Sequence, residues 1–412
     1  MVLQTLLRIH NLLFLCLAVF GVMMGMPHDE NIPQFKVFCT IFGLIKDPDQ
    51  RIRFLNEQLA PTPESLLSEI EKLAVITSKT DDLTEERQKL QKIDQNWTAE
   101  EIVREDGLKA KKFPAVDPDL PQVRLAAKKI RRIMRKAEDV IREFRGKAQE
   151  VVRLDGGART EFKKALSGDA NGKISQSSFA SRGGAGASTR RQDACSYNAG
   201  GTTEGPGKSL VNDVFCLCGS AGGSSSSEYS SACGQTMTET DVRWASSTGT
   251  DNALPANPET TFPTIMGKCP NQVGWDRPNL PSAAKLRRAL ADFDALLGKT
   301  NFAGSNPDRK AYHFGGGHGS TDGSCDGKTG DHQKVCVNYL KVMAGNGPGI
   351  SWKAAIEKAA GELEESERLS VEMNNTKTQL ELLAESAWGI YEGALTGYSE
   401  QSAPHPKESK SN

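Results

Sequence analysis

Cysteines in the middle of the chain have the type and spacing that could support either metal binding or disulfide formation. Residues 216 to 234 read CLCGSAGGSSSSEYSSACG, in which Cys216 and Cys218 stand one residue apart and Cys233 follows a Gly/Ser run. A structural zinc site needs paired ligands of the CxxC or HxxxH kind, and this Cys-X-Cys has neither a matching second pair nor a nearby histidine. The sequence therefore favours disulfide bonds, which would hold a segment with few apolar side chains of its own.

The N-terminus has the pattern of a secretory signal peptide. Arg8 and His10 precede an apolar run from Leu12 to Met24, and small residues stand at Gly21 and Gly25. An uncleaved membrane anchor is the alternative, but the run is shorter than the roughly 20 residues that cross a bilayer. We therefore expect residues 1–25 to be a signal peptide, and the rest of the chain to fold in an oxidising compartment.

Removal of the signal peptide takes Cys16 with it and leaves an even number of cysteines. The remaining eight are Cys39, Cys195, Cys216, Cys218, Cys233, Cys269, Cys325 and Cys336. An even count in a secreted chain favours disulfides, each of which contributes about 2–4 kcal/mol to stability. The sequence does not give the connectivity, although Cys325 and Cys336, with polar residues between them, are the best candidates for a local pair.

Good helix formers with almost no Gly or Pro fill residues 64–106. Four apolar residues stand seven apart in this segment: Ile76, Leu83, Leu90 and Trp97. The spacing predicts one helical rod of about 60 Å with a narrow coiled-coil seam. After the prolines of KKFPAVDPDLP, a second helix is predicted from about Gln122 to Leu166. Two long helices joined by a short turn predict an antiparallel hairpin.

The second half of the chain changes composition. Residues 167–280 are rich in Gly, Ser, Thr and Asn, which predicts short strands and loops, and residues 299–350 form a second loop region. Helices are predicted from Ser282 to Gly298, which can close the helix, and from Ser351, as N-cap, to about Thr396. The expected fold is therefore mainly α: a long antiparallel helical hairpin or bundle as a stalk, with a disulfide-stapled, loop-rich lobe.

Charge and motifs exclude several function classes. The net charge of −1 argues against a general nucleic-acid binder. Residues 124–164 hold 14 Lys or Arg against 6 Asp or Glu, but residues 357–392 are acidic, so helix packing or a solvated surface is favoured over a nucleic-acid face.

DANGKIS, from Asp169 to Ser175, resembles a calcium loop but lacks its first and last acidic ligands, and it is predicted to be a turn.

No residue constellation points to catalysis or to a cofactor. HFGGGHG, at residues 313–319, lacks the Lys-Ser/Thr of a phosphate loop and is predicted to be a flexible loop. GxSxG and HExxH are absent from the sequence, so no catalytic, cofactor-binding or metal-binding residue is assigned and the chain is not expected to be an enzyme. Two sequons, at Asn96 and Asn374, are expected acceptors for N-glycans.

The order of these motifs resembles the variant surface glycoproteins of African trypanosomes, with a B-type amino-terminal domain as in the congolense-like branch. The resemblance rests on NIPQFKVFCTIFGLIKDP, VFCLCGS followed by ACG, IMGKCP, GSCDGKTGDHQKVCVNY and ISWKAAIEKA. It covers nearly the whole chain after the signal peptide. It implies that residues 26–397 are the N-terminal-type domain of this family, and that residues 398–412 are a disordered tail.

The resemblance also implies a function and partners. The protein would be a homodimeric, lipid-anchored coat glycoprotein on the outer leaflet of the plasma membrane, which shields the parasite and mediates antigenic variation and evasion of host antibodies. It would pair Cys39 with Cys195. A lipid-anchor signal needs a hydrophobic tail, whereas this sequence ends HPKESKSN, so we expect a sequence that stops before its tail, or an unanchored relative. The alternative function is a transferrin-receptor-like, nutrient-binding receptor subunit of the same superfamily.

Overall fold

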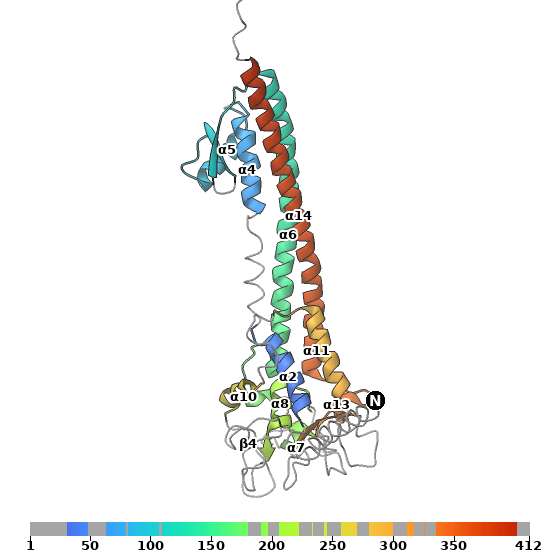
Figure 1. Cartoon of the computed structure of the whole chain (residues 1–412). Coiled ribbons are helices and arrows are strands. Elements are labelled where there is room, and N and C mark those ends of the chain that lie inside the picture. The colour runs from blue at the N-terminus through green and yellow to red at the C-terminus, as the bar shows by residue number, and fades with distance from the viewer. Residues whose placement is uncertain are drawn as a thin grey trace, which may run out of the picture. The chain divides into compact units, whose positions relative to one another are not determined.

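The protein divides into two compact units, each described separately below. The computed structural model describes residues 31–47, 63–79, 81–106, 109–179, 191–196, 206–221, 233, 243–244, 257–269, 280–299, 311–316, 325 and 335–401. The first unit comprises Met1–Arg51 and Gly156–Glu364, and the second comprises Ile52–Asp155 and Glu365–Asn412. Two long helices, α6 (Pro121–Ser167) and α14 (Ser351–Gln401), contribute residues to both (Figure 1). The fold is mainly α, as predicted.

The second unit is built on the antiparallel pair of α6 and α14, which lie side by side in Figure 1. Lys147 of α6 forms an ion pair with Glu372 of α14 at 3.2 Å, and nearer the end of α6 the buried Asp155 accepts a hydrogen bond from Ser366 at 2.6 Å. Residue numbers rise along one helix as they fall along the other, so the helices are antiparallel. In this unit α6 buries an apolar face through Ile130, Ala137, Val140, Phe144 and Val151.

The prediction of one rod over residues 64–106 is wrong, although its first part does lie antiparallel to α6: Arg145 of α6 pairs with Glu64, and Arg131 of α6 pairs with Asp82. This segment forms α4 (Pro63–Ile76), α5 (Thr84–Ile93) and β1 (Glu101–Asp106). β1 pairs antiparallel with β2 (Lys109–Pro114), with Glu101 opposite Pro114. The rod breaks after α4, where the Thr77 hydroxyl donates to the carbonyl of Leu73, and Leu83 takes a left-handed backbone conformation with φ of 57°. Local helix propensity is weak enough for tertiary packing to override it here.

The four apolar residues of the predicted seam nevertheless belong to one core. Ile76, Leu90 and Trp97 are buried, and the half-buried Leu83 packs against the same cluster. The cluster also takes in residues of β2, α6 and α14; at its aromatic part, the ring of Trp388 lies 5.0 Å from that of Phe113. The spacing therefore identified core positions correctly but not the path of the chain between them.

The first unit has a core of helices around an aromatic cluster. α2 (Ile32–Ile45) packs against α11 (Ala283–Leu296), and α8 (Leu210–Cys218) packs against α2. The ring of Phe293 lies 4.6 Å from that of Phe314 and 5.0 Å from that of Trp352. The helix predicted from Ser282 to Gly298 is present as α11; Ser282 is its N-cap, and Gly298, with φ of 74°, follows its end as predicted. α14 begins at Ser351 itself, so the N-cap position predicted there is wrong by about one residue.

Several short elements complete the first unit, and they correct the prediction of strands and loops alone over residues 167–280. The helical pieces are η1 (Gln176–Ser178), α7 (Arg191–Cys195), α8, α10 (Pro258–Gly267) and, later, α13 (Leu340–Met343). β3 (Ser220–Ala221) pairs parallel with β4 (Arg243–Trp244), and β5 (His313–Gly315) pairs antiparallel with β6 (Cys336–Asn338). α8 forms because LVNDVFCLC is an apolar run behind the N-cap Ser209.

The signal peptide predicted over residues 1–25 lies outside the described residues. The prediction of a disordered tail over residues 398–412 is wrong for its first four residues, which belong to α14, and the residues beyond Gln401 lie outside the described part of the chain. Within the described part of the chain, no helix combines the length and the apolar character that crossing a bilayer requires.

Candidate functional site

The eight cysteines after Cys16 form four disulfide bonds, all of them in the first unit. The pairs are Cys39–Cys269, Cys195–Cys216, Cys218–Cys233 and Cys325–Cys336. The local pair expected from the sequence, Cys325–Cys336, is present. The pair that the family resemblance implied, Cys39–Cys195, is wrong, because Cys39 at the middle of α2 is bonded to Cys269 just beyond α10.

The geometry of α8 explains why the Cys-X-Cys cysteines take different partners. Residues two apart on a helix point in directions that differ by about 200°. Cys216 therefore bonds back to Cys195 at the end of α7, while Cys218 bonds forward to Cys233. The Gly/Ser segment after α8 is thus closed by a bond that spans 15 residues, most of which lie outside the described part of the chain.

A buried arginine completes the end of α8. Arg191, the first residue of α7, has no exposed surface, and its guanidinium donates to the carbonyls of Gly219 at 2.5 Å and Cys216 at 2.7 Å. The last carbonyls of a helix have no partner within the helix and carry partial negative charge, so a cation is favourable there. The arrangement fixes α7 to α8 in addition to the disulfide. Nothing in the composition of RQDAC identified this arginine.

Asp213 of α8 is a second buried polar group that sequence reasoning missed. Its Oδ1 accepts from the backbone N–H of Gly207 and the side chain of Asn212, both at 2.9 Å. Its Oδ2 accepts from Tyr339 and Trp352, both at 2.6 Å. Burial is the largest influence on this carboxyl and raises its pKa, while the four hydrogen bonds act in the opposite direction.

The chemistry of Asp213 is that of a structural connection. Each of its oxygens is occupied by two protein donors, and the side chain is fully buried. Desolvation, followed by the Asp213 charge, raises the pKa of Tyr339 well above its usual value. The carboxyl links α8 to the residues before α13 and to the start of α14. The signal available in the sequence was an acidic residue within the otherwise apolar LVNDVFCLC.

The first part of the motif HFGGGHG forms a strand, which corrects the prediction of a flexible loop there. His313, Phe314 and Gly315 form the buried strand β5, and residues 317–319 lie outside the described part of the chain. His313 lies near Cys325 and Cys336, a group that could in principle hold a metal ion. Both sulfurs are joined in a disulfide bond, so neither is a free thiolate ligand.

DANGKIS is a turn, as predicted. The side-chain Oδ1 of Asp169 accepts from the backbone N–H groups of Asn171 at 2.8 Å and Gly172 at 2.9 Å. Gly172 has a positive φ of 73°, a conformation that glycine adopts without strain. The aspartate that would ligate calcium in a calcium loop instead stabilises its own backbone.

The two sequons differ in local structure. Asn96 is exposed in the turn after α5, and its hydroxyl residue Thr98 is exposed too. Asn374 is exposed on α14, but its Thr376 is buried and donates to the carbonyl of Glu372 at 2.9 Å within the helix. Both asparagines therefore face solvent, whereas only the sequon of Asn96 also has its hydroxyl residue exposed.

Comparison with known proteins gives two matches. The family of the trypanosomal VSG domain matches residues 13–382. The variant surface glycoprotein YnAT 1.1 of Trypanosoma congolense is 30% identical over 177 residues, which are 42% of this chain and 38% of that protein. The alignment thus spans well under half the length of this curated relative. The family match covers both units, including all eight cysteines of the four disulfide bonds, and it confirms the resemblance inferred from the motifs: the chain belongs to the trypanosomal VSG domain family.

Proposed function

We propose that this protein is a coat glycoprotein that shields the parasite plasma membrane and mediates antigenic variation and evasion of host antibody. The observation that carries the proposal is the family match over residues 13–382, since the family is one of surface coat glycoproteins. The protein acts through its surface and not through catalysis. The similarity to a variant surface glycoprotein of Trypanosoma congolense supports the same proposal.

The first unit suits a surface whose sequence changes between relatives. Four disulfides and the hydrogen bonds of the buried Asp213 tie the short elements together at fixed points. Connecting segments tolerate substitution and insertion better than core elements do. Antigenic change can then accumulate between fixed cysteines without loss of the fold.

The proposal includes how the protein is presented. We expect a homodimer, held by a lipid anchor in the outer leaflet of the plasma membrane and recognised by host antibodies. We also expect residues 26–397 to act as the N-terminal-type domain of the family. Residues 1–25 are expected to direct secretion and then to be removed, and the residues beyond the end of α14 at Gln401 to remain disordered.

N-glycans are proposed at both sequons, with fuller occupancy at Asn96. The exposed turn presents Asn96 and Thr98 together, whereas the buried hydroxyl of Thr376 donates to a backbone carbonyl of α14. Mass spectrometry of the secreted protein, with Asn96→Gln and Asn374→Gln as matched variants, measures each occupancy. A larger mass loss from Asn374→Gln than from Asn96→Gln would contradict the proposed order.

A pair of measurements on intact cells tests the coat function. The protein should be abundant, released by a phospholipase that cleaves glycosylphosphatidylinositol, and free of any stoichiometric ligand after incubation with host serum. A scarce protein that retains transferrin or another serum protein would overturn the coat function in favour of a receptor.

A further inference from the structure

A polar cavity in the second unit gathers cations on α6. Its volume is about 520 Å³, and it lies between the first turns of α6 and the segment that follows α4. Six cationic side chains line it: Lys79, Arg124, Lys128, Arg131, Arg132 and Arg135. The acidic side chain in its lining is Asp82. We call this cavity the α6 basic pocket.

The spacing of the cations concentrates like charge on one helix face. Arg124, Lys128, Arg131 and Arg135 follow one another at intervals of three or four residues, which places them on the same side of α6. Like charges at these intervals destabilise a helix by a few tenths of a kcal/mol per pair. An arrangement that is unfavourable for the isolated protein becomes favourable when an anion binds between the cations.

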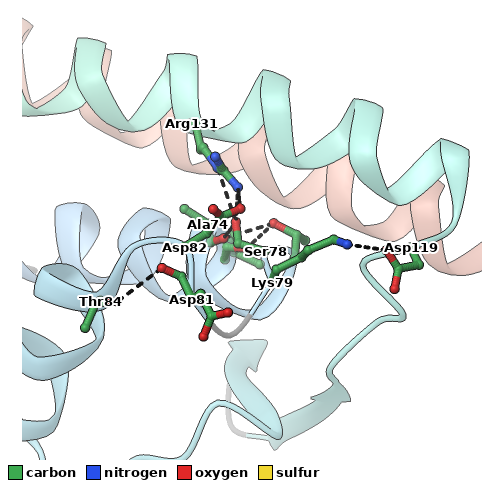
Figure 2. A network of polar contacts seen from close by, with 10 residues as sticks. Ala74, Ser78, Lys79, Asp81, Asp82, Thr84, Asp119 and Arg131 are labelled. Carbon is green, nitrogen blue, oxygen red and sulfur yellow. Dashed lines mark hydrogen bonds and ion pairs between the residues drawn. The ribbon is translucent and has the colours of Figure 1, made fainter.

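One cation of the pocket is held in place by its neighbours. Arg131 forms an ion pair with Asp82 at 2.5 Å, and its guanidinium also donates to the hydroxyl of Ser78 at 3.1 Å. Figure 2 shows the guanidinium directed at both groups. Ser78 is itself buried. A guanidinium that is already oriented loses less side-chain entropy when a ligand binds.

Three cations of the pocket retain uncompensated charge. Lys79 is paired with Asp119 at 2.6 Å, as Figure 2 also shows, and Arg124 donates to the backbone carbonyl of Asp119. Among the residues that the structure describes, no ion pair involves Lys128, Arg132 or Arg135. All three side chains are exposed, and all three line the cavity.

At the C-terminal end of α4, side-chain hydroxyl groups donate to the carbonyls that would otherwise repel an anion. The last carbonyls of a helix carry partial negative charge and would repel one. Here the hydroxyl of Ser78 donates to the carbonyl of Ala74 at 2.6 Å, and the hydroxyl of Thr77 donates to that of Leu73 at 2.9 Å (Figure 2 draws the Ser78 bond). These acceptors are therefore occupied where α4 meets the pocket.

We propose that the α6 basic pocket binds a ligand that carries two or more phosphate or sulfate groups, such as a phosphorylated or sulfated sugar. Guanidinium groups match the oxygens of these anions with paired hydrogen bonds. The volume is that of a pocket for a small organic molecule, larger than one inorganic anion fills. This binding goes beyond the coat function and does not depend on it.

Calorimetric titration of the full chain tests the proposal, with inositol hexakisphosphate as the probe and inorganic phosphate for comparison. The hexakisphosphate should bind at least about tenfold more tightly than phosphate, and its affinity should fall as salt screens the exposed cations. Absence of binding at low salt, or equal affinity for the two probes, would overturn the proposal.

Matched variants on α6 locate the site. Arg132→Gln with Arg135→Gln should weaken binding by about tenfold or more, because two charged donors are lost. Lys136→Gln with Arg142→Gln removes the same charge from exposed positions of α6 that do not line the pocket, and should change the affinity less than about twofold. Both double variants replace exposed side chains, and circular dichroism checks that they fold. Equal weakening by the two would show general charge attraction and contradict a site.

Vesicles distinguish the sources of the anion. Sedimentation with vesicles of phosphatidylcholine, with and without phosphatidylinositol 4,5-bisphosphate, reports binding to a lipid headgroup. Capture that depends on the bisphosphate and on Arg132 and Arg135 supports a headgroup ligand. Binding of the soluble hexakisphosphate without vesicle capture supports a free ligand of the same chemistry. Capture that persists in the Arg132→Gln, Arg135→Gln variant would overturn the assignment to this pocket.

Discussion

The two units of the protein maintain their folds by different means. The first unit contains all four disulfides and many short elements, such as α7 with 5 residues and α8 with 9. The sequence of the second unit contains no cysteine, and its core combines α4, α5 and the β1–β2 hairpin with apolar faces of the 47-residue α6 and the 51-residue α14. Long helices bury continuous apolar faces against each other, whereas short ones bury little each. The disulfide bonds therefore occur in the unit whose elements are mostly too short to stabilise one another by packing alone.

The largest expected effect comes from the disulfide that joins the most distant residues. Cys39–Cys269 spans 230 residues, and on the chain-entropy account its loss in Cys39→Ser, Cys269→Ser costs about 5–6 kcal/mol. Cys325→Ser, Cys336→Ser is the matched variant, and its bond spans 11 residues, so the cost should be about 2–3 kcal/mol. Urea unfolding followed by hydrogen exchange measures both. The exchange protection of α4 in the second unit should remain in each variant.

Equal costs for the two variants would contradict the role of loop closure. Loss of exchange protection throughout the second unit when the disulfides are reduced would contradict the conclusion that the two units are stabilised separately, because the second unit would then depend on bonds that lie outside it.

The corresponding test for the second unit is a packing substitution. Trp388 is buried, its ring lies 5.0 Å from that of Phe113 and 5.7 Å from that of Tyr391, and the guanidinium of Arg104 lies 5.0 Å from its centre. Trp388→Ala should cost about 3–4 kcal/mol through the cavity that it leaves. The measurement is thermal unfolding with and without a reducing agent.

Trp388→Phe serves as the control, because it keeps most of the aromatic contact and should cost markedly less. If reduction of the disulfides alone destabilised the second unit as much as Trp388→Ala does, the two means of stabilisation would not be separate.

The sequence predicted the long elements of both units well. α6 and α14 were found because helical periodicity and the absence of breakers persist over many turns, and α11 was found through Ser282 and Gly298. The segment around α4 and α5 was predicted wrongly, since Leu83 reverses the chain with a backbone conformation that no residue type there signals. β1 replaced the end of the predicted rod because EIVRED pairs antiparallel with KAKKFP of β2, a pairing between strands that helical periodicity does not reveal.

The functional features were predictable only where chemistry is local. Cysteine number and the Cys325–Cys336 pair follow from the sequence, while the partner of Cys39 depends on how α2 and α10 pack. Asp213 and Arg191 were missed, because a buried charge is recognised by the groups that surround it in space. The α6 basic pocket is visible in part, since the sequence shows an excess of cations in residues 124–164, but that excess alone favours a packing or solvated face over a binding site.

A smaller effect is expected from an ion-paired acid of the first unit. Burial disfavours the charge of Glu161, whose side chain is 7% exposed, but hydrogen bonds from Lys358 at 2.7 Å and Lys164 at 2.9 Å outweigh it and leave its pKa lowered. A lowered pKa in the folded state means that this stabilisation is present at neutral pH and is lost as the pH falls below the pKa of the unfolded chain, about 4.3, and through the lower value of the folded state. The contribution is about 1 kcal/mol, since both lysines are partly exposed.

Glu161→Gln is the variant that checks this pH dependence. Its free energy of unfolding should be lower than that of the wild type at neutral pH, and the two should converge as the pH falls towards about 3. A difference between them that stays constant over this range would show that the charge of Glu161 contributes nothing and that only its packing does.

The smallest effect is expected at the ion pairs on the solvent side of α14 in the second unit. Arg368 donates to Glu365 at 2.8 Å and 2.5 Å and also pairs with Glu372, and these bonds raise its pKa. All three side chains keep substantial exposure to water, with 55% of that of Arg368 accessible. Water solvates the separated charges nearly as well as the pair does, so good geometry here does not translate into stability. Arg368→Gln should leave the thermal midpoint of the second unit unchanged within error, in low salt and in high salt alike. A loss comparable to that of Trp388→Ala would mean that surface charge, and not the apolar seam between α6 and α14, holds the unit without disulfides together.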